Sequence, residues 1–292
     1  MRGAERRAAS VPVWLGAAGV LALCFADALL PPYLTSTATL EPPSPRHWLG
    51  TNDIGQSVLV GLLRAAPTTI GLGLATAALA LGIGCGMASI AVLFPKWGRA
   101  LVLHLTDIAE IIPSILVLLL IAAWRQPGAA EIIVMMALLT WHDDVRVLRA
   151  ALLRELSREN IRLARHMGAG WPSVLLHHAL PQMLPTLVGV YVQNVVQAVM
   201  RVAGLAFLGL TAADLLTWGS MVQDAMGYLH TPAWTWLLLP PAFCLSGFLL
   251  WLTRIGAHHA RHHRQPQGTP HDFNPKPKPL CGRDRAPSGH LF

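Results

Sequence analysis

Three polar side chains recur at helical spacing within the apolar segment 183–203. Asn194, Gln197 and Arg201 are separated by steps of three and four residues, so they share one face of a helix. Polar groups inside a membrane helix are costly and usually face a cavity or a partner. One interpretation is a stripe that lines a translocation path. The other is hydrogen bonding of the two amides to neighbouring helices, with Arg201 extending to the membrane interface.

Acidic residues gather where apolar segments begin or end. Asp143-Asp144 is the only adjacent acidic pair of the chain, and it lies just before Arg146 and Arg149. This arrangement favours local ion pairs or helix capping over catalysis by paired carboxylates. Asp107 and Glu110 open another apolar segment, and we expect them to pair with arginines of the loops rather than to carry protons.

The motifs that an ATPase or a hydrolase needs are absent from the sequence. There is no GxxxxGK[ST] loop to hold nucleotide phosphates, and the lysines are only Lys96, Lys276 and Lys278. There is likewise no HExxH or GxSxG motif, and the four cysteines show no metal-binding spacing. We therefore expect this chain to be no enzyme and to bind no cofactor or metal.

Histidines are concentrated near the C-terminus. His258, His259, His262 and His263 would form two i,i+4 pairs if the last helix continues, which is a geometry able to hold a metal ion. The alternative, which we favour, is a basic patch that contacts anionic lipid headgroups. The segment 257–292 is rich in Pro, His and Arg, and its composition predicts disorder.

The composition places these residues in a membrane protein. Of the 292 residues, 53% are apolar and 13% charged, and the mean hydropathy is +0.48. So few charges cannot cover a soluble globule of this size, and so much apolar surface excludes disorder. The net charge of +7 then reflects the placement of Lys and Arg relative to the bilayer rather than binding to nucleic acid.

Apolar runs of the length that crosses a bilayer define the expected helices. The first run follows a basic N-terminus and is too long for the apolar part of a cleaved signal peptide, so we expect an uncleaved helix. The last run is expected to kink at Pro240-Pro241. The six predicted spans are Val11–Leu30, Thr68–Phe94, Ile108–Trp124, Ile132–Trp141, Met183–Ala203 and Trp234–Ile255.

The positive charges orient these spans. Lys and Arg gather in the N-terminus, in the loop after residue 94, in the loop 143–181 and in the tail, whereas the opposite loops hold only Arg46, Arg64 and Arg125. By the positive-inside rule, both termini are cytoplasmic. The expected organisation is a cytoplasmic N-terminus at 1–10, a first helix at 11–30, a periplasmic segment at 31–67, a membrane core at 68–256 and a cytoplasmic tail at 257–292.

The cytoplasmic loop 143–181 has its own pattern. It begins as a helix with Leu148, Leu152 and Leu153 spaced for one apolar face. Gly168 is placed to end a short helix, and Pro172 suits the first turn of the next one. By itself this pattern also fits an ordinary basic loop.

Within that loop, Ala164-x-x-x-Gly168 followed by Leu180-Pro181 resembles the EAA loop of bacterial ABC-importer permeases. The resemblance implies a coupling helix that docks on a cytoplasmic ATPase. The acidic residue of the EAA triplet is Arg162 here, which puts the docking contact in doubt or implies a compensating charge on the partner. The implied coupling residues are Arg162, Leu163, Ala164, Gly168, Ala169, Leu180 and Pro181.

Two more stretches resemble the peptide/nickel branch of that family. His47–Gly55 is similar to HxLGTDxLG, with Asn52 and Ile54 as departures. The stretch 206–210 followed by 218–221 is similar to FLGLG…WGxM, with Thr211 in place of the last glycine. The resemblance implies a periplasmic gate that contacts a binding protein, formed by Phe207, Gly209, Trp218, Gly219 and Met221.

The resemblance as a whole implies an all-α type I importer permease of about six transmembrane helices in the bacterial inner membrane. Its partners would be a second permease subunit, two ATPases that bind ATP and Mg²⁺, a binding protein and membrane lipid. The substrate is expected to be nickel, as a chelate, or di- and oligopeptides. The absence of an acidic residue just before Phe207 inclines the interpretation toward nickel.

Two other classes of protein remain as alternatives. An ion-coupled secondary transporter should show two similar halves, and the sequence has no clear internal repeat. An intramembrane enzyme needs a nucleophile with a base or a metal, and no such group of residues is visible.

Overall fold

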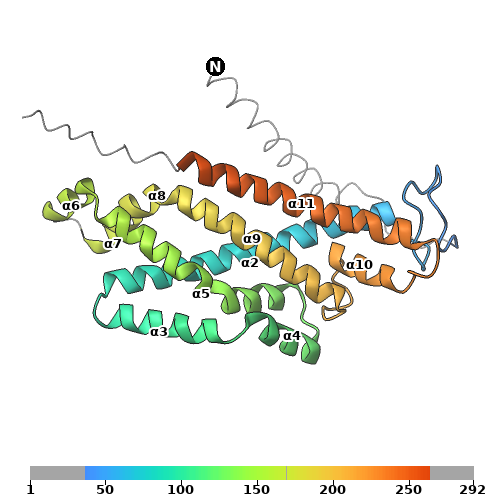
Figure 1. Ribbon diagram of the computed structural model, residues 1–292, viewed down its shortest axis with the longest axis horizontal. Coiled ribbons are helices and arrows are strands. Elements are labelled where there is room, and N and C mark those ends of the chain that lie inside the picture. Colours follow the sequence, from blue (N-terminus) through green and yellow to red (C-terminus); the bar gives the residue numbers. More distant parts are fainter. Residues whose placement is uncertain (1–36, 169, 264–292) are drawn as a thin grey trace, which may run out of the picture.

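The computed structural model describes residues 37–168 and 170–263, and helices make up most of this part (Figure 1). Seven helices form the body. They are α2 (Val58–Leu93), α3 (Trp97–Ile111), α4 (Ser114–Arg125), α5 (Ala129–Leu156), α9 (Leu184–Phe207), α10 (Trp218–Met226) and α11 (Trp234–His263). Between α5 and α9 lie α6 (Glu159–His166), α7 (Trp171–Val174), the π-helical turn Leu175–Ala179 and α8 (Leu180–Gln182).

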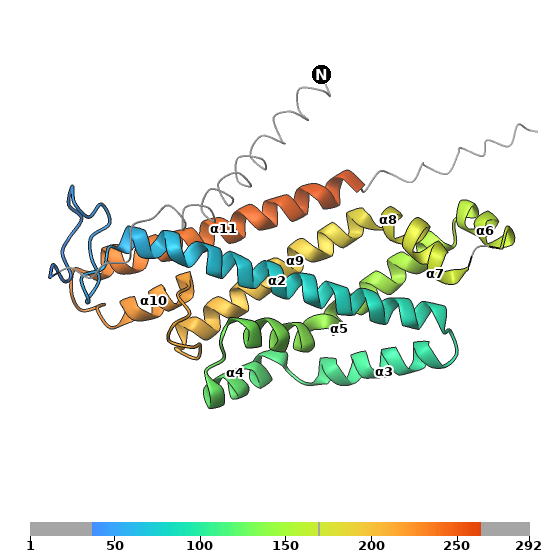
Figure 2. The same ribbon diagram turned by 180° about the vertical axis from the view of Figure 1, so that it is seen from behind.

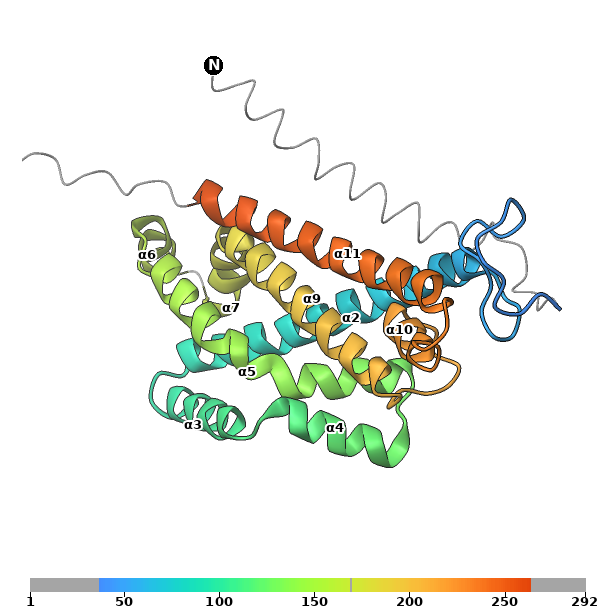
Figure 3. The ribbon, with the colours of Figure 1, turned by 45° about the vertical axis from the view of Figure 1, so that its right-hand side comes forward.

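The core of the molecule is built by α2, α5 and α9, which pack along one another. Small residues allow this approach: a Cβ placed on Gly73 of α2 would lie 2.4 Å from Val199 Cγ2 of α9. Ala65, Ala66 and Ile70 of α2 are buried in the same cluster. On opposite sides of these three helices lie α11 and the pair α3 and α4 (Figure 3). The fold therefore places the interface of α2, α5 and α9 at the centre.

Three helices, α2, α9 and α11, are long and apolar enough to cross a membrane, as three of the predicted spans require. The helix α2 begins at Val58, well before the predicted Thr68, and continues through Pro67. The helix α11 likewise continues through Pro240 and Pro241. The predicted span 11–30 lies outside the described residues.

The expectation of one helix over Ile108–Trp124 is wrong. The chain breaks between α3 and α4, and the two helices are bent by 67°, so that the pair amounts to one broken span or a re-entrant loop. The cause is Pro113, because a proline disfavours helical geometry in the residue before it. Ile112 accordingly has φ −87° and ψ 114°, which is extended backbone.

The predicted span Ile132–Trp141 is part of a longer helix. The helix α5 has 28 residues and runs without a break from Ala129 into the region expected to be cytoplasmic. At about 1.5 Å per residue its length is roughly 42 Å, which exceeds the thickness of a bilayer core. Asp143 and Asp144 consequently lie in the middle of a helix, not at its end.

The short elements gather at the two ends of the molecule. The helices α6, α7 and α8 lie at one end, and α10 lies with the segment 37–57 at the other (Figures 1 and 2). The long helices α2 and α9 connect these ends. The residues predicted for coupling and those predicted for the gate are thus separated by the length of the bundle.

Candidate functional site

A small polar cavity lies where α2, α5 and α9 meet. Its volume is about 20 Å³, which is enough for a single water molecule. All three residues of the predicted polar stripe line it. The polar lining residues are Thr76 of α2, Thr140 and Asp143 of α5, and Asn194, Gln197 and Arg201 of α9. The structure thus brings the predicted stripe together with residues of two other helices.

Residues of this cavity make close polar contacts with one another and with their neighbours in α5. Asn194 Nδ2 donates a hydrogen bond to Asp144 Oδ2 at 2.5 Å. Arg201 Nη2 lies 3.7 Å from Asp143 Oδ2, and His142 Nε2 lies 3.3 Å from Asp143 Oδ1. Arg201 therefore approaches α5 through its contact with Asp143.

Asp143-Asp144, which was expected to form local ion pairs or to cap a helix, lies within α5, and the ion-pair partners of the nearby Arg146 are other carboxylates. Because α5 is continuous, the two carboxylates face α9, whereas Arg146 faces α3. Its Nη2 atom lies 2.6 Å from Asp107 Oδ1 and 2.9 Å from Glu110 Oε2. The predicted pairing of Asp107 and Glu110 with an arginine is confirmed, and this arginine lies in α5 rather than in a loop.

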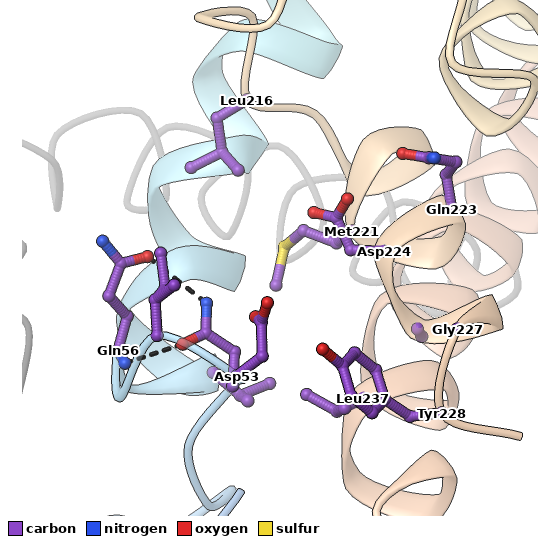
Figure 4. A pocket seen from close by; sticks show the side chains of 13 residues that line it. Asp53, Gln56, Leu216, Met221, Gln223, Asp224, Gly227, Tyr228 and Leu237 are labelled. Carbon is purple, nitrogen blue, oxygen red and sulfur yellow. Dashed lines mark hydrogen bonds between the residues drawn. The ribbon is translucent and has the colours of Figure 1, made fainter. Parts of the chain in front are cut away.

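A larger pocket, of about 600 Å³, opens at the end of the molecule that holds α10. Asp53 from the segment before α2, Asp224 of α10 and Tyr228 after α10 point toward the same space, with Met221 and Leu237 beside them (Figure 4). Partial burial, and next the negative charge of Asp53, raise the pKa of Asp224. The pocket is therefore acidic and can accept a cationic group.

Of these pocket residues, the sequence prediction named only Met221 as a site residue. Asp53 lies within the stretch His47–Gly55, which was singled out as a motif, so a signal for it was present. Asp224 and Tyr228 carry no comparable signal, because their proximity to Asp53 depends on how α10 packs. That motif stretch itself is folded around Thr51, whose buried Oγ1 donates to Ala38 O at 2.7 Å.

Trp218 and Gly219, which were predicted to form a gate, lie in packing contacts. Trp218 is buried, and its Nε1 donates to Leu62 O of α2 at 3.0 Å. A Cβ on Gly219 would lie 2.8 Å from both Cα and O of Ala203, so glycine lets α10 rest on the backbone of α9.

The other predicted gate residues are spread around α10. Phe207 ends α9 and is exposed, and Gly209 follows it with φ +69°. Met221 lines the acidic pocket. The five predicted gate residues are thus distributed over the end of α9, the segment that follows it and α10.

The segment predicted to couple to an ATPase has the helix boundaries that the sequence indicated. After α6, Gly168 adopts φ +92°, and Pro172 lies in the first turn of α7. Leu180 and Pro181 begin α8, directly before α9. Ala169 and the side chains of Arg162 and Ala164 lie outside the described residues.

One side of this segment is anchored and the other is open. Ile161 is buried against Leu148 and Leu152 of α5. Leu163 is exposed, and Met167 is 83% exposed. Leu153, which was expected to share the apolar face of Leu148 and Leu152, is exposed instead.

A buried carboxylate that sequence reasoning missed lies where α5 ends. Glu155 is only 2% exposed, and its Oε2 lies 2.7 Å from Arg158 Nε. Arg154 Nε lies 3.6 Å from the other carboxylate oxygen. An acidic residue between Arg154 and Arg158 was the available signal. The contacts fix the turn between α5 and α6, and with it the position of the segment that follows.

The histidine-rich region is described only in part. The helical backbone of α11 continues to His263, which is the condition for the i,i+4 pairs. The side chains of 257–263 and the tail from 264 onward lie outside the described residues. Within the described part, no three His, Cys, Asp or Glu side chains are grouped so that they could hold a metal ion.

Comparisons with known proteins agree on one family. Residues 78–265 match the model of the family described as "binding-protein-dependent transport system inner membrane component". A Brucella suis protein, whose name describes a peptide permease, is 31% identical over 207 residues, which are 70% of this chain and 68% of that protein. The oligopeptide transport system permease protein OppC of Mycobacterium tuberculosis is 29% identical over 240 residues, which are 78% of this chain and 81% of that protein.

Two further similarities extend this picture. The dipeptide transport system permease protein DppC of Alkalihalophilus pseudofirmus is 27% identical over 238 residues, 78% of each chain. A solved structure of the MetNI methionine ABC transporter, in an inward-facing conformation, superposes with a TM-score of 0.51 at 19% identity and covers 68% of this chain and 96% of that chain. That likeness shows the type I permease fold. The family match covers more than half of this chain. The chain therefore belongs to the family of inner membrane components of binding-protein-dependent transport systems.

Proposed function

We propose that this chain is one of two permease subunits of an ATP-driven importer that carries di- or oligopeptides inward by alternating access. The named relatives that support this substrate class are permeases for peptides, oligopeptides and dipeptides. The observation that carries the proposal is the polar cluster of Asp143, Asn194, Gln197 and Arg201, which lies between helices that are otherwise apolar. Polar groups in a membrane helix are costly, and this cost is reduced when they face a path for a polar substrate.

The coupling to ATP would occur at α6 and α7. An anchored Ile161 beside exposed Leu163 and Met167 is suited to dock on a partner and to pass its motion into α5. ATP and Mg²⁺ would be bound by the two ATPase subunits and not by this chain. The predicted residues Arg162, Leu163, Ala164, Gly168, Ala169, Leu180 and Pro181 would contribute to this coupling.

The opposite end would meet the binding protein on the periplasmic side, with both termini in the cytoplasm. Phe207, Gly209, Trp218, Gly219 and Met221 would form the gate region there, through the packing of α10 on α9 and the pocket beneath it. The second permease subunit and lipid would cover the exposed apolar side chains of the bundle. Among these are Ile111, Leu120 and Trp124 of α3 and α4, and Phe243 and Leu250 of α11.

Reconstituted uptake tests the proposal. The complete complex of two permeases, ATPases and binding protein is placed in liposomes, and uptake of labelled trialanine and of a nickel–histidine chelate is measured with and without ATP. We expect ATP-dependent uptake of the peptide. Uptake of the nickel chelate without uptake of the peptide would show that the substrate is nickel and not a peptide. Uptake that does not need ATP would favour a secondary transporter and contradict the proposal of an ATP-driven importer.

The path is tested by substitution. Arg201→Ala and Asn194→Ala should lower uptake while the ATPases still co-purify with the permease. Arg125→Gln, which removes an exposed arginine paired with Glu131 far from the cavity, is the matched control. Normal uptake by the first two variants would exclude the cavity from the path.

A further inference from the structure

The pair formed by Asp143 and Arg201 is accessible from outside this chain. The side chain of Asp143 is 53% exposed and that of Arg201 is 22% exposed. Arg201 lies in α9, one of the helices that are long and apolar enough to cross a membrane. A charged side chain in such a helix is costly unless it pairs or meets a polar ligand. The exposed side of the pair is where a ligand can reach both charges.

The contact within the pair is loose. The separation of 3.7 Å between Arg201 Nη2 and Asp143 Oδ2 exceeds the length of a charge-assisted hydrogen bond. The same chain makes much shorter ion pairs elsewhere, at 2.6 Å between Arg146 and Asp107. Most of the five guanidinium donors of Arg201 therefore remain available to another acceptor.

Neutral polar groups complete the surroundings of the pair. Thr76 lines the cavity, is buried, and its hydroxyl has no hydrogen-bond partner among the described residues. Gln197, one turn before Arg201, also lines the cavity and is exposed. Asn194 is held in place by Asp144. A buried hydroxyl without a partner indicates that a polar group is still missing from this site.

We propose that Arg201 and Asp143 determine specificity by binding the two charged termini of a peptide in transit. Arg201 binds the C-terminal carboxylate and Asp143 binds the α-ammonium group. This inference rests on the proposed function, since it requires a peptide substrate. The cavity of about 20 Å³ admits no more than a water-sized group, so the peptide main chain lies along the exposed side of the pair.

The charge balance favours such an exchange. Without substrate, Arg201 and Asp143 are partners of each other, with His142 also beside Asp143. With substrate, each of the two has a terminus of opposite sign as its partner. Neither state leaves an unpaired charge inside the membrane, which would be strongly unfavourable. The peptide competes with an existing ion pair, so its binding is weak enough to permit release.

Blocked peptides test the proposal in the reconstituted complex. Uptake is compared for trialanine, its C-terminal amide and its N-acetyl derivative, each at a concentration that saturates the binding protein. The same binding protein serves every variant, so a change in the ratio of uptake between peptides must arise in the permease. Arg201→Gln should lower the preference for trialanine over its amide about tenfold or more. Asp143→Asn should lower the preference for trialanine over its N-acetyl derivative by a similar factor.

The crossed pattern separates recognition from a structural role. If the ion pair only stabilises the helices, both variants lower the uptake of all three peptides by the same factor and the ratios stay unchanged. That result would overturn the inference while the proposed function stands. Arg201→Lys keeps the charge and should keep the preference for the free carboxylate, and Arg125→Gln should match the wild type. No uptake of any peptide by the wild type would overturn the proposed function and the inference together.

A second measurement avoids the binding protein. In the complex of permeases and ATPases, Gln197→Cys is labelled with a membrane-permeant maleimide, and the same complex without this substitution gives the background. Trialanine should slow the labelling, and its amide should protect much less. In the double variant Gln197→Cys/Arg201→Gln the two peptides should protect equally. Equal protection by both peptides with Arg201 present would contradict the assignment of this residue to the carboxylate.

Discussion

Asn194 of α9 donates its side-chain amide to the carboxylate of Asp144 of α5, at 2.5 Å. The two residues lie near the centre of their helices, and Asp144 is buried. This bond joins the helix that follows the coupling segment to the helix that precedes it. It also satisfies a carboxylate that would otherwise be buried without a partner.

Replacing Asn194 by leucine should destabilise the protein. The substitution leaves the carboxylate of Asp144 without its donor, and we expect the free energy of unfolding to fall by about 1–3 kcal/mol. Thermal unfolding of the purified protein in detergent measures this. Gln197→Leu, one turn further along and exposed, should change the free energy by only about 0.5 kcal/mol. Equal effects of the two substitutions would contradict the special role of Asn194.

Replacing Glu155 by glutamine should disturb the turn between α5 and α6. Glu155 is buried and holds Arg158 at 2.7 Å, so the variant weakens a charge-assisted contact by about 1–3 kcal/mol. In the assembled transporter, we expect the binding protein to stimulate ATP hydrolysis less than in the wild type. Glu159→Gln, which removes an exposed carboxylate of the same turn, is the control. Full stimulation with Glu155→Gln would show that this contact does not position the coupling segment.

Adding a methyl group at Gly219 should separate α10 from α9. The new Cβ would lie 2.8 Å from the backbone of Ala203, which cannot yield as a flexible side chain would, and overpacking of this kind costs about 1–3 kcal/mol. Thermal unfolding of Gly219→Ala checks the prediction. A Cβ at Gly204, the residue after Ala203 in α9, meets nothing within 4 Å. Gly204→Ala should therefore be neutral or stabilising, and a loss equal to that of Gly219→Ala would refute the argument.

The acidic pocket should make stability depend on pH. Partial burial and the charge of Asp53 raise the pKa of Asp224, so the folded protein holds this proton more tightly than the unfolded chain does. The resulting stabilisation is present below the ordinary aspartate pKa and is lost as the pH rises through the raised value. The melting temperature of Asp224→Asn minus that of the wild type should thus increase as the pH rises from acidic to neutral. Asp53→Asn should reduce the same dependence, and a gain that is equal at every pH would contradict this assignment.

The sequence predicted those features that local patterns specify. The polar face of α9 follows from the spacing of Asn194, Gln197 and Arg201, and the helix break at Gly168 follows from a glycine and a proline. The charges in the sequence also predicted that Asp107 pairs with an arginine, which is Arg146.

The features that the sequence did not predict depend on tertiary packing. The pairing of Asp143 with Arg201 requires α5 to continue past the expected end of its span and to lie against α9. Asp53 and Asp224 face each other only because α10 folds over the start of α2. Pro113 was a signal for the helix break before it, but the apolar run on both sides of this proline favoured one continuous span.

The sharp bend between α3 and α4 limits what can surround it. A helix end leaves up to four carbonyl groups, and the following helix start up to four amide groups, without intrahelical partners. Hydrocarbon chains offer no hydrogen bonds to such groups. The unpaired backbone groups at the elbow of Ile112 and Pro113 therefore require water or polypeptide beside them, so the acyl chains of the bilayer are kept from this stretch of the perimeter.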